Sequence, residues 1–108
     1  MATPIEFIKY VIDQITGYSN IRFRKMFGEY MVYVNDKPIL LVCDSTVYVK
    51  KREELETILS EAELGIPYDG AKEHYILDLD NRELTQQVIS ILEEITPVPK
   101  KRKTNRNK

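Results

Sequence analysis

The amino-acid sequence predicts an α+β fold, a two-layer sandwich in which an antiparallel sheet carries helices on one face. Two observations support this: apolar residues recur at helical spacing near both ends of the chain, and successive strand patterns joined by short turns lie between them. With 108 residues, 43% of them apolar and 31% charged, the chain has the composition of one globular domain. We expect residues 1–96 to form this domain and residues 97–108 to be a disordered basic tail.

The first element is expected to be a helix over residues 4–16. Thr3 and Glu6 form a capping box, and Pro4 suits the first helical position. Gly17 follows as a helix stop. The apolar face of this helix consists of Ile5, Ile8, Val11, Ile12 and Ile15.

A meander of strands is expected next. Residues 21–26 alternate, with Ile21 and Phe23 on one face and Arg22 and Arg24 on the other, and Gly28 then permits a bend. Residues 29–34 are rich in β-branched and aromatic side chains, which predicts a second strand.

Two turns divide the rest of the meander. Residues 35–37 (Asn-Asp-Lys) predict a hairpin turn, and Pro38 marks the start of the next strand. Residues 39–43 are apolar on both faces, as in a central strand covered on both sides. Residues 44–46 turn the chain again, and residues 47–50 form a shorter strand.

The second half of the sequence predicts two more helices, with one strand between them along the chain. Residues 52–62 carry Leu55, Ile58, Leu59 and Ala62 at helical spacing, and residues 65–70 are rich in turn residues. A strand is expected over residues 74–79, after which Asp80 caps a final helix that ends near residue 96. The buried stripe of this helix consists of Leu84, Val88, Ile91, Leu92 and Ile95.

Three short segments carry a family resemblance: residues 24–28 (Arg-Lys-Met-Phe-Gly) with Tyr33, residues 47–50 (Val-Tyr-Val-Lys), and residues 67–72 (Pro-Tyr-Asp-Gly-Ala-Lys). Over roughly residues 4–95 the chain resembles the amino-terminal domain of the TfoX/Sxy family, bacterial proteins linked to natural competence. The resemblance implies a secretion-chaperone-like sandwich and a regulatory or adaptor domain that acts through protein contacts. The full-length regulators also carry a helical second domain, in whose place we expect the basic tail of this chain. Fold analogy and open sheet edges also suggest a homodimer.

Charge is divided unevenly along the chain. Residues 97–108 hold six of the sixteen basic residues and no acid, which leaves ten basic residues against seventeen acids, a net charge of about −7, in the predicted domain. Weak, nonspecific nucleic-acid binding is therefore expected only at the tail or at a local basic patch. The alternatives are a solvated tail and an ordinary exposed strand face. The candidate nucleic-acid contacts are Arg22, Arg24, Lys25, Lys100, Lys101, Arg102, Lys103 and Arg106.

A second candidate surface lies in the connection before the last predicted strand. Tyr68, Asp69, Lys72 and His74 form a polar, turn-rich stretch suited to contacting a partner protein, because function concentrates in loops. The alternative is a structural connection that Tyr68 ties to the sheet.

No residue set points to catalysis, a metal or a cofactor, so we expect none of these. His74 is the single histidine and has no partner at metal-ligand spacing, and Cys43 is expected to be a small buried apolar residue. The sequence contains four glycines and no phosphate-binding or nucleophile motif. The longest apolar run, residues 39–43, is too short to cross a membrane, and no signal peptide is evident, so a cytoplasmic protein is expected.

Overall fold

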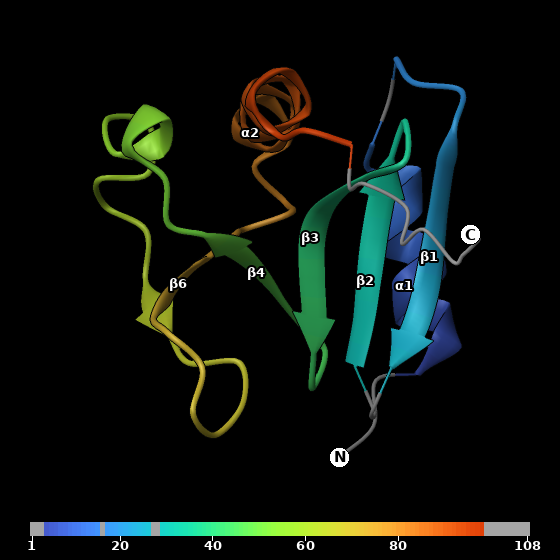
Figure 1. The fold of residues 1–108 in the computed structure, drawn as a ribbon, viewed down its shortest axis with the longest axis horizontal. Helices are drawn as coiled ribbons and strands as arrows, with labels where there is room; N and C mark the ends of the chain where they lie inside the picture. Colours follow the sequence, from blue (N-terminus) through green and yellow to red (C-terminus); the bar gives the residue numbers. More distant parts are fainter. Residues whose placement is uncertain (1–3, 16, 27–28, 99–108) are drawn as a thin grey trace, which may run out of the picture.

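The computed structural model describes residues 4–15, 17–26 and 29–98 (Figure 1). Six strands form one antiparallel sheet in the order β1-β2-β3-β4-β6-β5, accompanied by two α-helices, which confirms the predicted α+β class. The elements in chain order are α1 (Ile5–Asp13), β1 (Ile21–Met26), β2 (Glu29–Val34), β3 (Lys37–Cys43), β4 (Thr46–Lys50), the 3₁₀ helix η1 (Glu53–Leu55), β5 (Leu64–Gly65), β6 (His74–Ile76) and α2 (Arg82–Ile95).

Two tight turns set the register of the central strands. Asn35 and Asp36 between β2 and β3 have φ angles of 53° and 66°, and Asp44 and Ser45 between β3 and β4 have 54° and 57°. Consecutive positive φ angles are typical of type I′ hairpin turns, whose twist matches that of the strands they join. Both predicted turns are therefore confirmed.

One face of the sheet forms the core. In β2 the alternate residues Tyr30, Val32 and Val34 are buried, and they join a single cluster with buried residues of both helices. In Figure 1, α1 lies behind β1 and β2, while α2 is seen end-on and contacts β3. Within the described ranges, both helices therefore pack on this core face, as predicted. The buried helix residues in the cluster are Ile8, Val11, Val88, Ile89 and Leu92.

The helix ends differ from the prediction. α1 is shorter than the expected residues 4–16, and Pro4 precedes its first turn without a side-chain cap bond; Thr3 lies outside the described residues. α2 is capped by Asn81, whose Oδ1 accepts a hydrogen bond from the Leu84 amide at 3.2 Å, and not by Asp80. Asp80 has other partners, because its Oδ1 accepts from the Tyr10 hydroxyl at 2.9 Å.

The prediction of a helix over residues 52–62 is wrong, because the backbone hydrogen bonds of this segment are mostly not those of an α-helix. The structure has η1 followed by turns, held mainly by bonds spanning three residues, such as Glu56 N–H to Glu53 O at 3.2 Å. Leu55 and Leu59 are buried as the spacing indicated. Two buried leucines satisfy the packing of this segment without a regular helix.

The last strands also differ in extent. β6 begins at His74, as predicted, but ends at Ile76, whereas the expected strand reached residue 79. Leu77 and Leu79 are still buried, and the Leu77 amide still bonds to Val47 O at 2.9 Å. β5 was not predicted, because two residues carry too short a pattern to identify.

Candidate binding groove on the helix-free face of the sheet

The face of the sheet opposite the helices, called the helix-free face below, carries a row of large side chains. Strand register places Met31 beside Leu41, Leu41 beside Tyr48, and Tyr48 beside Ile76, so the row crosses β2, β3, β4 and β6. A sheet face exposed to water normally shows polar residues at these alternate positions. The row is therefore more apolar than a solvated face requires.

A connecting segment, residues 66–73 between β5 and β6, is tied to the helix-free face by Cys43. The Cys43 Sγ lies 3.0 Å from the carbonyl oxygen of Pro67, to which the thiol donates. Burial raises the pKa of this thiol, and the carboxylates of Glu29 and Asp44 raise it further, so the proton needed for the bond is retained. Cys43 is half-buried and holds a loop, whereas the sequence predicted a small buried apolar residue.

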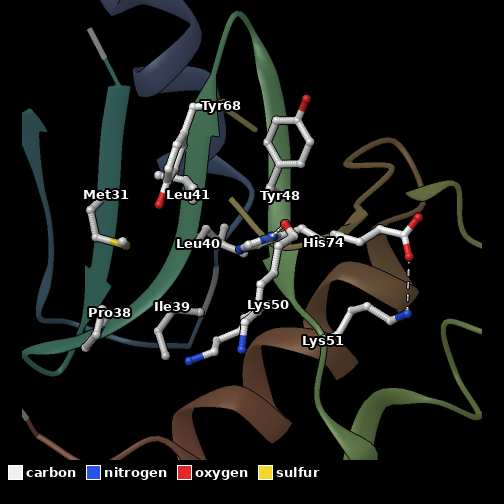
Figure 2. Close-up of a pocket in the computed structure, with 12 residues that line it drawn as sticks. Met31, Pro38, Ile39, Leu40, Leu41, Tyr48, Lys50, Lys51, Tyr68 and His74 are labelled. Atoms are coloured by element: carbon white, nitrogen blue, oxygen red, sulfur yellow. Dashed lines mark hydrogen bonds and ion pairs between the residues drawn. The ribbon is translucent and has the colours of Figure 1, made fainter. Parts of the chain in front are cut away.

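The sheet and this segment enclose a groove of about 530 Å³. Met31, Leu41 and Tyr48 contribute from the strands, and Tyr68 contributes from the connecting segment (Figure 2). The Tyr68 side chain is 49% exposed, so it is not tied down as an ordinary structural anchor would be. The volume lies within the range of sites that bind small molecules or a few side chains.

The border of the groove is basic. Its lining includes Lys50, Lys51, Lys72 and His74 but a single acid, Glu73. Glu73 Oε1 lies 3.6 Å from Lys51 Nζ, an ion pair drawn as a dashed line in Figure 2. Among the described residues, neither Lys50 nor Lys72 forms an ion pair. The groove therefore presents two ammonium groups beside an apolar floor.

His74 is fixed by two contacts at the groove. Its Nδ1 lies 2.7 Å from the Lys72 carbonyl oxygen, which can only accept, so Nδ1 carries a proton and donates. Its ring meets the Tyr48 ring edge-on, with centroids 6.3 Å apart. These contacts orient the imidazole and hold Lys72 close to β4.

Three of the four residues predicted as a partner surface line the groove: Tyr68, Lys72 and His74. Asp69 does not line it, because it lies in the turn at the exposed end of the connecting segment. The strand residues Met31, Leu41, Tyr48 and Lys50 were not predicted as site residues. The only signal for them was strand alternation, which indicates a face of the sheet and not a groove on it.

The basic residues of β1 do not form one surface. Arg22 and Arg24 lie on the helix-free face, whereas Lys25 pairs with Tyr30 and shares the core side. Arg22 Nε lies 3.3 Å from Asp36 Oδ1, and its guanidinium carbon lies 4.7 Å from the centre of the Tyr33 ring. The predicted tail contacts lie outside the described residues: Lys100, Lys101, Arg102, Lys103 and Arg106.

The described residues lack two kinds of feature. They contain no group of three or more His, Cys, Asp or Glu residues placed to hold a metal ion. No helix in the described part of the chain has the length and apolar character needed to cross a membrane.

Comparison with known proteins connects this architecture to a family. The family model described as the TfoX N-terminal domain matches residues 13–89. The chain belongs to the TfoX N-terminal domain family. The match includes all six strands and every residue of the groove, so the groove is built entirely within the TfoX N-terminal domain.

A similar protein comes from Spirochaeta aurantia, where it is described as an uncharacterized 12.7 kDa protein in the trpE 5′ region. The two are 30% identical over 105 residues, which cover 95% of this chain and 91% of the relative. The relative therefore matches the present protein along nearly its whole length.

Proposed function

We propose that this protein is a non-catalytic regulatory or adaptor domain that binds a partner protein at the groove on its helix-free face. The observation that carries the proposal is the apolar row bordered by Tyr68, Lys50 and Lys72. Contiguous apolar surface bordered by polar groups is typical of protein-binding sites. Family membership supports a regulatory role, because TfoX proteins are linked to competence.

The alternative is a nucleic-acid-binding protein that uses the tail and the Arg22, Arg24 and Lys25 strand. It has less support in the described residues. Arg22 is paired with Asp36, and Arg24 and Lys25 project from opposite sides of the sheet. The described residues include all seventeen acids of the chain, whose field repels phosphates.

A homodimer is a further proposal, based on the open edges of the sheet at β1 and β5. Pairing of two β1 strands would bring Arg22, Arg24 and Lys25 of both copies together. Charged residues on an edge strand oppose such pairing. We therefore expect any dimer to use another surface, and sedimentation at high protein concentration measures whether one forms.

Site-specific photo-crosslinking tests the proposed function. A benzophenone amino acid replaces Tyr68 at the groove or, as a matched control, Tyr10 on α1, which is exposed to a similar degree (40% against 49%). We expect a protein adduct at position 68 that survives nuclease treatment and is absent at position 10. Equal adducts at both positions, or adducts only to nucleic acid, would count against the proposal. An adduct to a second copy of this chain would identify a homodimer.

A further inference from the structure

We propose that the occupant of the groove is an acidic segment of the partner, with one apolar side chain seated against Met31, Leu41 and Tyr48 and flanking carboxylates paired with Lys50 and Lys72. This inference rests on the proposed function and specifies its ligand.

The apolar part of the ligand follows from the floor of the groove. Met31, Leu41 and Tyr48 come from three adjacent strands, so the backbone beneath them is held by ladder hydrogen bonds and the floor is rigid. Methionine adapts to ligands of different shape, which suits a surface that accepts one of several apolar side chains. Tyr68 stands at the side of the groove, where it can cover a seated side chain (Figure 2).

The acidic residues expected in the ligand follow from the distribution of charge on the protein. The described residues carry ten cations and seventeen acids, yet three of the ten cations line this groove. Glu73 neutralises Lys51, which leaves Lys50 and Lys72 as the groups available to an incoming anion. Charge complementarity of this kind selects the partner and speeds encounter.

The same charges exclude two other occupants. The chain's own residues 97–108 contain six cations and no acid, so they are repelled by Lys50 and Lys72. An oligonucleotide carries a phosphate on every nucleotide. Its phosphates would extend from the groove over the acidic remainder of the domain, which repels them. A short acidic peptide segment places its carboxylates only where the lysines are.

Selection from a random dodecapeptide library displayed on phage tests this inference with the full-length protein. We expect the selected peptides to share a Leu, Ile, Met or Phe flanked by Asp or Glu. Synthetic copies of these peptides are then titrated against three proteins by fluorescence polarisation: the wild type, Lys50→Glu/Lys72→Glu, and the matched control Lys9→Glu/Lys25→Glu. Lys9 and Lys25 are exposed and do not line the groove, so the control has the same net charge change.

The expected result is a loss of affinity of about ten-fold or more for the groove variant, since two exposed ion pairs become repulsive contacts, and much less for the control. Tyr68→Ser should weaken the same peptides without changing the thermal midpoint. The inference is overturned if no peptide is enriched, if enriched peptides lack acids, or if both charge variants bind equally. Preferential binding of a labelled oligothymidylate at Lys50 and Lys72 would also overturn it.

The two proposals fail in different ways. If position 68 crosslinks to a protein but acidic peptides do not bind, the adaptor function stands and the ligand class is wrong. If neither position 68 nor the peptide library identifies a protein ligand at the groove, the proposed function fails as well.

Discussion

The two faces of this sheet are built from the same strands but have different side chains and surroundings. On the core face, Val32, Leu40 and Val49 are fully buried beneath the helices. On the helix-free face, Met31 and Tyr48 stay partly exposed, and the adjacent groove is basic. Since the core face alone supplies a continuous buried cluster, the helix-free face can change with little effect on stability. Most residues of the buried cluster and most residues that line the groove therefore lie on opposite faces of the sheet.

The largest expected effect is a difference in stability between two alanine variants, one truncated on each side of the sheet. Ile89→Ala removes a fully buried side chain of α2 that packs in the core and does not line the groove, so it should lower the free energy of unfolding by about 2–5 kcal/mol. Met31→Ala on the helix-free face should lower it by less than about 1 kcal/mol, because Met31 borders the open groove and is only partly buried. Urea denaturation followed by circular dichroism measures both. Similar losses for the two variants would break the distinction between the faces.

A smaller effect is expected where the helix-free face is already crowded. At Gly65 an added Cβ would lie 3.0 Å from Ile76 Cδ1 and 3.2 Å from Tyr48 Cε1. Gly65→Ala should therefore destabilise by about 1 kcal/mol and displace the Tyr48 ring, which lines the groove. Adding Ile76→Val removes the nearer atom and should restore part of the stability in the same denaturation assay. No recovery in the double variant would show that the clash is not the cause.

Loss of the Cys43 bond should loosen one segment only. Cys43→Ala removes the donor to Pro67 O, so we expect faster amide exchange in residues 66–73 and a stability loss of about 1 kcal/mol or less. Cys43→Ser keeps a donor at this position and serves as the control. Hydrogen–deuterium exchange with mass spectrometry distinguishes this result from a global change, in which β2 and β3 would also exchange faster.

The smallest effect concerns the attachment of α2 to the core face, and it depends on pH. Hydrogen bonds from Asn35 and Lys37 hold the pKa of Glu93 below its ordinary value of 4.5. A carboxyl whose pKa is lowered by folding stabilises the fold above its unfolded pKa and loses that contribution as the pH falls through the folded pKa.

Glu93→Gln should therefore be less stable than the wild type at neutral pH, and the difference should shrink below about pH 4.5. The Lys37 bond to the Glu93 backbone oxygen, at 2.6 Å, persists in the variant and keeps the effect small. Thermal unfolding from pH 7 to pH 3 measures the difference. A difference that stays constant over this range would rule out the pH-dependent contribution.

The sequence predicted the strands well because their signals are local. Alternation over β1 and β2 and the Asn35–Asp36 turn follow from the chemistry of adjacent residues. The prediction of a helix over residues 52–62 was wrong because the spacing of apolar residues indicates only that Leu55 and Leu59 are buried. Irregular turns bury these two side chains as well. Phe23 was placed on the correct face but is 38% exposed, since it lies on an edge strand where the core ends.

The groove was predicted only in part for a related reason. Tyr68, Lys72 and His74 stand close together in the sequence and were identified as one surface. Lys50 and Met31 are distant in sequence, and only strand register brings them near that loop. Such a site depends on non-local pairing, which a single sequence does not reveal.

The paired positive-φ turns have an evolutionary consequence. By fixing register, they assign alternate positions of β2 and β4 to opposite faces, because a slip of one residue would exchange every side chain between the faces. Mutations at the helix-free positions can therefore accumulate under selection for a partner, while the intervening positions are selected for folding. Members of this family can in this way keep one scaffold and diverge in what they recognise.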